Sequence, residues 1–308
     1  MSATRAAIGI DIGGTKTVVA VVEPSGQIRS RVEYATNSKR GFVACMEELI
    51  AAIRTVCQNA EVSEDKLCGF GIGCAGPVNP LRGTIHNPYT LPGWDDADIL
   101  TPLREAFHLP VRMENDAEAA AVGEYRWGAG CGASPLLMVT LGTGIGGAIL
   151  VNGEIYRGLI GEHPEIGHIV VRPDGPDCYC GARGCWESIA SGTAIAENGK
   201  PLGFADSRAV FAAAAGDENA SAIVREAVEA TGSALWTLVH TLLPQRIILG
   251  GGIGVEHFEP LAAAFRARLP RATQLPKKGG VDIVRAALGK DAGVIGAAGL
   301  AFSETASK

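Results

Sequence analysis

A strand, a glycine-rich turn and a second strand occur twice in this 308-residue chain, about 130 residues apart. The first copy reads A-A-I-G-I-D, I-G-G-T-K and T-V-V-A-V-V-E, and the second runs from Leu136–Leu141 through G-T-G-I-G-G to Ala148–Val151. A supersecondary unit that repeats in this way indicates a duplicated α/β domain. The chain is long enough for two domains, and 47% hydrophobic residues suffice for a large core.

Helices and further strands are expected around the two copies. Apolar residues on one stripe, among them Leu49 and Ile53, predict a helix over 41–58. The Ala/Gly-rich segment 291–302 predicts an apolar last helix that packs back on the first domain. We predict a first domain of residues 1–118 plus 291–308 and a second of 119–290. The other expected elements are strands at Ile28–Tyr34, in G-F-G-I-G-C-A-G, in L-P-V-R-M-E-N-D and at Arg246–Leu249, and helices at 97–107, Ala117–Arg126, 187–198, 207–215 and 219–243.

Charge and hydropathy exclude several classes of function. The net charge is −6 and no basic run stands out, which disfavours nucleic acid as the main partner. No apolar run is long enough to span a bilayer, and the N-terminus reaches the charged Asp11 after only a short apolar stretch, unlike a signal peptide. A cytoplasmic protein without a membrane partner is therefore expected.

Glycines cluster in three turns that follow apolar strands. The first, D-I-G-G-T-K-T at 11–17, is neither a Walker A motif nor a Rossmann fingerprint, because a strand follows it. Backbone N–H groups in such a turn can hold terminal phosphates, and a carboxylate at the strand end can orient hydrated Mg²⁺. A plain hairpin with a capping Asp is the alternative for one turn, but three turns together favour a nucleotide. The predicted phosphate and nucleotide residues are Asp11, Gly13, Gly14, Thr15, Lys16, Gly142, Thr143, Gly144, Gly251 and Gly252.

The sequence E-N-D-A at 114–117 places two polar side chains at the end of a strand and the start of a helix. Ligands of open α/β folds gather at such strand ends. Asp116 can serve as a helix N-cap, or as the base that accepts a proton from a phosphoryl-acceptor hydroxyl. The three glycine turns favour the base, and Asn115 can then orient the hydroxyl.

Three cysteines lie within eight residues, in C-Y-C-G-A-R-G-C, and a histidine precedes the first of them by ten. Three thiolates and one imidazole satisfy a tetrahedral Zn²⁺ with no open position, so His168, Cys178, Cys180 and Cys185 predict a structural zinc site. The scattered cysteines are interpreted as buried small hydrophobes: Cys45, Cys57, Cys68, Cys74 and Cys131.

Two glutamates bracket the zinc motif. Glu165 stands three residues before His168, and Glu187 stands two residues after Cys185. Glutamates are usually solvated, but a metal nearby would fix these two relative to each other. Rigidly held carboxylates suit the recognition of sugar hydroxyls.

Together these motifs resemble the ROK family of bacterial-type sugar kinases, in the actin-like ATPase superfamily, over nearly the whole chain. D-I-G-G-T-K and L-G-T-G-I-G-G look like the two phosphate motifs of the family, and G-C-A-G-P-V at 73–78 looks like its sugar-side loop. E-I-G-H with C-Y-C-G-A-R-G-C-W-E is similar to the family signature. The resemblance implies a two-domain actin-like (ribonuclease H-like) α/β fold with an inter-domain cleft. It also implies Asp116 as catalytic base, and at the sugar Gly76, Asn115, Glu165, His168 and Glu187.

The resemblance implies ATP-dependent phosphorylation of a hexose or N-acetylhexosamine at the 6-hydroxyl, with Mg²⁺, structural Zn²⁺ and a homodimer or homotetramer. A glucokinase is the first choice, and an N-acetylmannosamine, N-acetylglucosamine or fructose kinase is the alternative. His163-Pro164 is similar to the fructokinase-like branch. Thr90 stands before L-P-G-W where many members carry Asn, a role that Asn87 could take only in a rearranged loop.

Two rival functions from other classes are disfavoured. A sugar-responsive repressor would carry a helix-turn-helix before the first phosphate motif, and only ten residues precede Asp11. A catalytically dead sugar-binding protein is at odds with the intact Asp116 and the intact glycine turns.

Overall fold

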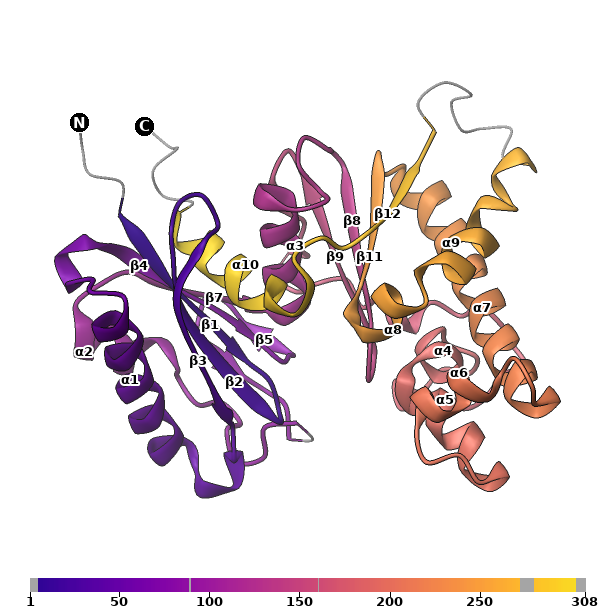
Figure 1. Ribbon diagram of the computed structural model, residues 1–308, viewed down its shortest axis with the longest axis horizontal. Helices are drawn as coiled ribbons and strands as arrows, with labels where there is room; N and C mark the ends of the chain where they lie inside the picture. Colours follow the sequence, from indigo (N-terminus) through magenta and orange to yellow (C-terminus); the bar gives the residue numbers. More distant parts are fainter. Residues whose placement is uncertain (1–4, 89, 160, 272–279, 303–308) are drawn as a thin grey trace. The chain divides into compact units, whose positions relative to one another are not determined.

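The computed structural model describes residues 5–88, 90–159, 161–271 and 280–302, and it contains two compact α/β units. Unit 1 comprises the described residues of Met1–Gly132, Gly153–His163 and Ala287–Lys308. Unit 2 comprises those of Ala133–Asn152 and Pro164–Ala286. Figure 1 colours the elements of both units along the sequence.

The sheet of unit 1 has the order β3-β2-β1-β4-β7. Its strands are β1 (Ala6–Ile12), β2 (Lys16–Val22), β3 (Ile28–Ala35), β4 (Leu67–Cys74) and β7 (Val111–Asn115). The first three form an antiparallel meander, whereas β4 is parallel to β1 and β7 is parallel to β4. The carboxyl ends of β1, β4 and β7 therefore lie at one edge of the sheet. A short ribbon of β5 (Val78–Asn79) and β6 (Thr84–Ile85) follows β4.

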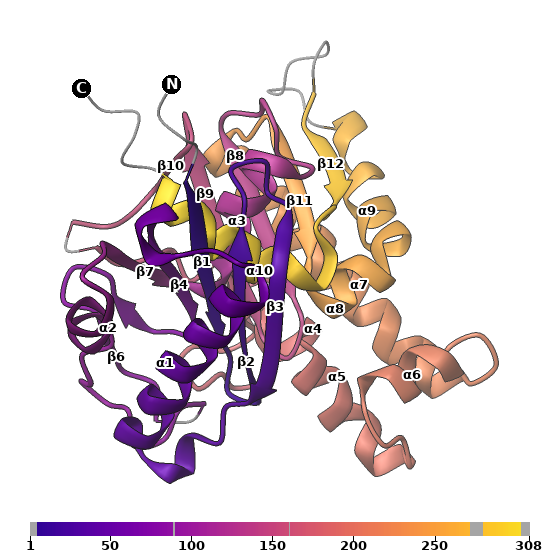
Figure 2. The ribbon, with the colours of Figure 1, turned by 60° about the vertical axis from the view of Figure 1, so that its left-hand side comes forward.

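Helices cover both faces of this sheet (Figure 2). On one face, α1 (Phe42–Asn59) and α2 (Leu100–Phe107) share a buried core with β1, in which Leu49 and Ile53 pack near Ile8 and Ile10. On the other face lie α3 (Asp116–Trp127) and the last helix α10 (Ala292–Ala301).

The last helix approaches the backbone of the sheet very closely. A Cβ on Gly71 of β4 would lie 1.7 Å from the carbonyl oxygen of Ala297, and one on Gly9 of β1 would lie 2.0 Å from that of Val294. Only glycine permits α10 to pack at this depth. Unit 1 thus contains the last helix, as expected from the sequence. It also contains all of α3 and residues Gly153–His163, which lie beyond the predicted domain boundary at residue 118. The reason is that α3 packs along α10.

Unit 2 repeats the same order of elements. A hairpin of β8 (Leu136–Leu141) and β9 (Ile145–Val151) is followed by β11 (Arg246–Gly250) and β12 (Asp282–Arg285), which continue the sheet from β8 in parallel. In unit 1, β1 and β2 form the corresponding hairpin, and β4 and β7 the corresponding parallel strands. The predicted duplication is confirmed by this topology. The short strand β10 (Glu154–Ile155) opens the Gly153–His163 segment of unit 1.

Six helices of unit 2 are described: α4 (Glu187–Ala190), α5 (Gly192–Gly199), α6 (Ser207–Ala213), α7 (Glu218–Leu242), α8 (Gly251–Glu256) and α9 (Phe258–Arg266). Asp206 and Asp217 cap α6 and α7 by accepting a hydrogen bond from a backbone N–H three residues on. The largest buried side chain, Trp186, donates its indole N–H to Thr231 of α7 at 3.1 Å.

Several local predictions were wrong. The helix predicted over 187–198 is two helices, because Ser191 is extended and its hydroxyl accepts from Ala194 N–H as the N-cap of α5. The glycines of G-G-G-I-G form the end of β11 and the first turn of α8 rather than a loop. Cys131 is exposed and Cys68 is only partly buried, unlike the other three scattered cysteines. Strand β12 and the short strands β5, β6 and β10 were not predicted.

Within the described ranges, no helix combines the length and the apolar character that crossing a membrane requires.

Candidate functional site

The register of three parallel strands gathers the predicted residues of unit 1. Asp11 of β1 lies opposite Gly73 of β4, which lies opposite Glu114 of β7. The next row along the sheet is Ile12, Cys74 and Asn115. The first glycine turn, the sugar-side loop and E-N-D-A begin at the row of Asp11, Gly73 and Glu114, so they emerge together at the carboxyl edge of the sheet, where ligands of such folds bind.

Asn115 and Asp116 have different local roles. Asn115 is the N-cap of α3: its side-chain oxygen accepts from the N–H of Ala117 at 2.9 Å, and the residue is 9% exposed. Asp116, the first residue of α3, is exposed, and its Oδ1 also accepts from Ala117 N–H at 2.8 Å. The capping role that competed for Asp116 therefore belongs to Asn115. Asp116 therefore presents its carboxylate at the positive end of the α3 dipole.

Asp11 sits in an environment that disfavours a negative charge. Burial, and next the charge of Asp116, raise the pKa of Asp11 to about 6, against smaller opposite effects of Lys16 and Arg31. The carboxylate also packs on α10, because a Cβ on Gly293 would lie 2.5 Å from its Oδ2. Two carboxylates are thus held near each other, as in a site that receives a cation.

The first glycine turn is partly committed to its own hairpin. Gly13 N–H donates to the carbonyl of Lys16 at 3.0 Å, which closes the turn. Gly14 and Thr15 lie outside the paired residues of β1 and β2. The ammonium of Lys16 forms an ion pair with Glu33 at 3.3 Å, so this predicted phosphate ligand is engaged with β3. The four residues from Gly13 to Lys16 thus form one turn, and Gly14 and Thr15 lie at its tip.

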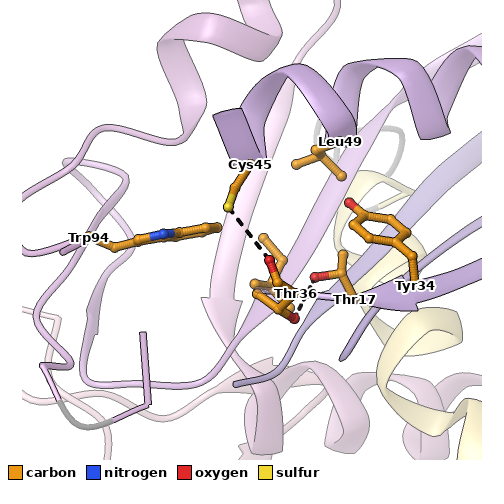
Figure 3. A pocket seen from close by; sticks show the side chains of 7 residues that line it. Thr17, Tyr34, Thr36, Cys45, Leu49 and Trp94 are labelled. Carbon is orange, nitrogen blue, oxygen red and sulfur yellow. Dashed lines mark hydrogen bonds between the residues drawn. The ribbon is translucent and has the colours of Figure 1, made fainter. Parts of the chain in front are cut away.

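A small recess of about 10 Å³ lies beside this turn, between α1 and the meander (Figure 3). A volume of about 10–15 Å³ holds a single water molecule, so the recess is too small for a sugar or a nucleotide. The hydroxyls of Thr17 and Thr36 lie 3.0 Å apart on its wall, and Thr36 donates to the carbonyl of Gly13 at 2.6 Å. The hydroxyl of Thr36 therefore holds the first glycine turn in place, and the recess is not itself a substrate pocket.

The sugar-side loop contacts both neighbouring motifs. A Cβ on Gly76 would lie 2.5 Å from the side-chain nitrogen of Asn115, and one on Gly14 would lie 2.4 Å from the methyl group of Thr90. Asn87 is buried, donates to the carbonyls of Ala75 and Gly76, and accepts from Thr90 N–H. Asn87 is therefore engaged at both ends within the loop, which does not fit the role of a substitute sugar ligand.

A buried ionic cluster beside Asp116 was missed in the sequence. The guanidinium of Arg157 lies 2.6 Å from Glu114 and 3.8 Å from Glu118, whose side chain is 1% exposed. Burial raises the pKa of Glu114 to about 7 against the opposing influence of Arg157. The two glutamates flank Asn115 and Asp116, so Arg157 anchors the Gly153–His163 segment to the strand–helix junction that carries Asp116. In the sequence, Glu114 and Glu118 stand on either side of Asn115 and Asp116, but no local pattern points to Arg157 as their partner.

In unit 2, the second glycine turn lies at the carboxyl ends of β8 and β11. Its carbonyls at Gly142 and Thr143 accept from the N–H groups of Gly192 and Thr193, at 2.7 and 3.1 Å. These two residues open α5 and were not singled out in the sequence. Gly251 packs against the same strand end, because a Cβ on it would lie 2.3 Å from the carbonyl of Leu141. Gly252 is exposed beside it.

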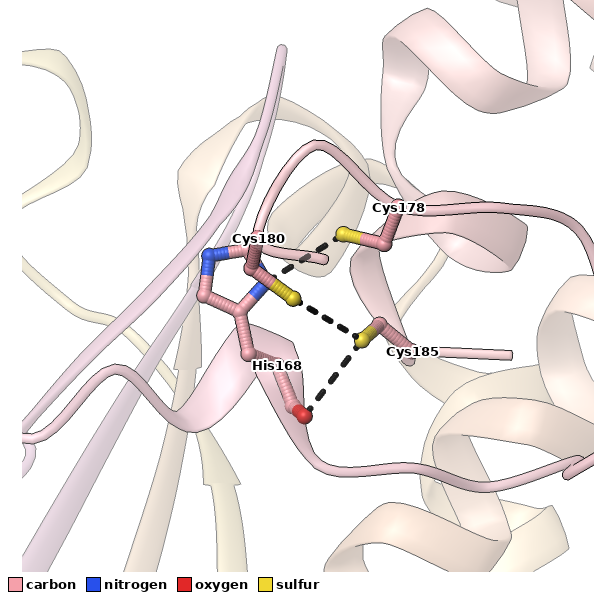
Figure 4. A group of neighbouring side chains, drawn as sticks. All are labelled: His168, Cys178, Cys180 and Cys185. Atoms are coloured by element: carbon pink, nitrogen blue, oxygen red, sulfur yellow. Dashed lines mark hydrogen bonds between the residues drawn. The ribbon is translucent and has the colours of Figure 1, made fainter. Parts of the chain in front are cut away.

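The predicted zinc ligands of unit 2 come together (Figure 4). The ligand atoms of His168, Cys178, Cys180 and Cys185 all lie within 4.8 Å of one another. The Sγ atoms of Cys180 and Cys185 are 3.6 Å apart, and Cys178 Sγ is 3.5 Å from His168 Nδ1. Tetrahedral Zn²⁺ with ordinary bond lengths requires about 3.8 Å between sulfurs and about 3.6 Å between sulfur and nitrogen. The donor set and its spacing fit zinc, and the thiols are free rather than disulfide-bonded.

The two predicted sugar carboxylates differ in their surroundings. Glu187, at the start of α4, accepts from Ile145 N–H at 2.6 Å through Oε2 and from the hydroxyl of Tyr179 at 2.9 Å through Oε1. Glu165 is exposed, and its carbonyl accepts from His168 N–H at 3.1 Å, which closes the turn that carries the histidine. Glu187 therefore connects the second glycine turn to the cysteine loop, a connection that the sequence did not predict.

Two repeated α/β units, each with a glycine turn at the end of its first strand, define a two-domain α/β protein with the actin-like ATPase fold. The sequence matches the ROK family over residues 7–304, and the chain belongs to that family.

Three relatives illustrate the similarity. A glucokinase of Halalkalibacterium halodurans is 36% identical, over 94% of this chain and 92% of its own. An N-acetylmannosamine kinase of Shigella boydii is 33% identical, over 96% and 98%. The solved structure of a ROK family glucokinase from Streptomyces griseus, in complex with glucose and AMPPNP, is 34% identical over 97% of this chain and 99% of its own, with a TM-score of 0.76.

Proposed function

We propose that this chain transfers the terminal phosphoryl group of ATP to the 6-hydroxyl of a hexose, with glucose as the first candidate. The observation that carries the proposal is the position of Asp116, at the start of α3 and beside Asp11, where β1, β4 and β7 end. A carboxylate there can accept the proton of the attacking hydroxyl. The glucokinase of Streptomyces griseus, solved with glucose and AMPPNP, supports both substrates.

Polar groups of both units are assigned to the sugar. Asn115 and Gly76 contribute from unit 1, and Glu165, His168 and Glu187 from unit 2. A carboxylate oxygen can accept two hydrogen bonds, so Glu187 can keep Tyr179 and Ile145 as partners and still accept from a sugar hydroxyl.

The glycine turns and Asp11 are assigned to the nucleotide. Backbone N–H groups at Gly14, Thr15, Thr143 and Gly144 suit the phosphates, and Gly251 with Gly252 lets the nucleotide approach the backbone. A bound Mg²⁺ neutralises charge on the phosphoryl group during transfer. Asp11 would hold it once its carboxyl is ionised.

A structural zinc ion would fix the cysteine loop. His168, Cys178, Cys180 and Cys185 fill four positions and leave none open, so they serve to hold the loop and not to activate a substrate.

Several finer points stay predictions. These are the inter-domain cleft, a homodimer or homotetramer, and the cytoplasmic location where ATP is available. The choice among glucose, mannose, N-acetylglucosamine, N-acetylmannosamine and fructose depends on residues beside the proposed sugar contacts, including Thr90 and His163.

The test is ADP release by the purified chain, with ATP and Mg²⁺, across these five sugars. Glucose is expected to give the highest kcat/KM. Asp116→Asn is expected to lower kcat by a factor of about 10²–10⁴, the usual contribution of general-base catalysis, while glucose still binds.

Asp65→Asn, an exposed acid on another part of unit 1, is the matched control and is expected to keep full activity. Substantial residual kcat in Asp116→Asn would contradict the assignment of the base, and no sugar-dependent ADP release with any of the five would contradict the proposed function.

A further inference from the structure

The cysteine loop reaches the second glycine turn through one side chain, Tyr179. Its hydroxyl donates to Glu187 Oε1 at 2.9 Å, and the other oxygen of Glu187 accepts from the backbone N–H of Ile145 at 2.6 Å. Ile145 is the first residue after the turn Gly142–Gly144. A continuous path of two hydrogen bonds therefore links the loop to the turn, entirely within unit 2.

Tyr179 also contacts a zinc ligand. Its ring lies edge-to-face with the imidazole of His168, with ring centroids 5.0 Å apart and an angle of 84° between the planes. Such pairs are favourable beyond the area that they bury. The phenol is thus held at one end by Glu187 and along its ring by His168.

Little else fixes this side chain. Tyr179 is 82% exposed, so its orientation depends on these two contacts and on its own backbone. That backbone stands between Cys178 and Cys180, two of the four ligand residues. A metal ion that fixes both neighbours would fix the position from which the phenol reaches Glu187.

Glu187 in turn fits the glycine turn tightly. A Cβ on Gly144 would lie 2.7 Å from Glu187 Oε2, and one on Gly167 would lie 3.4 Å from Glu187 Cβ. The terminal torsion of a glutamate is broad when nothing restrains it. The hydrogen bond from Tyr179 to Oε1 restricts the range of that torsion, and it thereby keeps Oε2 at hydrogen-bond distance from the N–H of Ile145.

We propose that Tyr179 is a positioning residue that transmits the occupancy of the zinc site to the second glycine turn, by holding the carboxylate of Glu187 on Ile145 N–H. The value of this link for phosphoryl transfer rests on the proposed function, but the link itself is a property of the free protein. Through this link, the zinc-bound cysteine loop would restrain the second glycine turn, which is assigned to phosphate binding.

The test is amide hydrogen exchange at Ile145, measured in zinc-loaded protein and in protein stripped with a chelator. In the parent chain, zinc removal is expected to raise exchange by about 2–10-fold, the range that the loss of one ordinary hydrogen bond gives. In Tyr179→Phe, which keeps the ring on His168, exchange is expected to be raised already with zinc bound. Removing zinc from that variant should then raise the exchange at Ile145 only slightly further.

Zinc content separates this role from a general effect on the loop. Tyr179→Phe is expected to retain one zinc per chain, because no ligand is changed. Tyr156→Phe, an exposed tyrosine of unit 1, is the matched control and should exchange at Ile145 like the parent chain in both states. Glu187→Gln is expected to raise exchange to the same level whether or not zinc is bound.

Two results would overturn the proposal. One is parent-like exchange at Ile145 in zinc-loaded Tyr179→Phe, and the other is a full zinc-dependent change in that variant. Because exchange is measured without substrate, a negative kinase assay would count against the proposed function and leave this result unaffected.

Discussion

Asp11 is a carboxylate whose ionisation, which the proposed Mg²⁺ site requires, lowers the free energy of unfolding of the chain. Burial and the nearby charge of Asp116 raise its pKa from the ordinary 3.8 to about 6 in the folded chain. The folded state therefore binds a proton at Asp11 more tightly than the unfolded state does. The free energy of unfolding therefore falls as pH rises from about 3.8 to about 6, and the contribution of Asp11 is largely lost above pH 6.

The size of this loss follows from the shift. About two pKa units at about 1.4 kcal/mol each give close to 3 kcal/mol at neutral pH. Asparagine has nearly the same shape and no charge to bury. Asp11→Asn is therefore expected to stabilise the ligand-free protein by about 2–3 kcal/mol at pH 8 and to leave it nearly unchanged at pH 4.

The assay is urea unfolding followed by circular dichroism at several pH values between 4 and 8, in zinc-loaded protein without added Mg²⁺. Glu47→Gln, an exposed acid of α1, is the matched control and is expected to show no comparable gain. Adding Mg²⁺ and ATP should narrow the difference, because the parent chain gains binding energy that the variant loses. An equal gain at pH 4 and pH 8, or a loss of stability at pH 8, would refute the reasoning.

Two further predictions concern the metal loop and the sheet of unit 1. Cys180→Ala is expected to lower zinc content, melting temperature and glucose affinity, measured by metal analysis, thermal unfolding and calorimetry. The control Cys131→Ala, at another exposed cysteine, is expected to leave all three unchanged. Unaltered glucose affinity in zinc-free protein would count against a supporting role for the metal. Gly71→Ala is expected to lose about 2–3 kcal/mol in urea unfolding, because its methyl group would overlap the Ala297 carbonyl of α10. Gly216→Ala, with open space around its Cβ, should stay near the parent value, and similar losses in both variants would contradict the packing argument.

Local patterns in the sequence predicted the elements that depend on near neighbours. The two hairpins and most of the helices follow from apolar periodicity and glycine turns, which act within a few residues. The prediction failed over 187–198, where apolar periodicity indicated one helix. There Ser191 takes an extended conformation as the cap of α5, and Gly192 donates to the carbonyl of Gly142, a partner far away in the sequence.

The buried ionic cluster shows a similar limit. In the sequence, Glu114 and Glu118 are ordinary charged residues beside the proposed catalytic Asp116. Their importance depends on Arg157, which a distant segment of unit 1 brings within 2.6 Å of Glu114. A buried carboxylate is tolerated only with such a partner, and no spacing in the sequence identifies it.

The sequence by itself determined the family resemblance, the duplicated α/β architecture and the residue types of the proposed zinc site, because each is a short pattern of composition and spacing. The tertiary structure decided which atoms those residues meet. Strand register placed Asp11 beside Asp116 and raised its pKa, and the packing of α4 placed Glu187 between Ile145 and Tyr179. These outcomes depend on long-range register and burial, which set the electrostatic and hydrogen-bonding environment of each side chain.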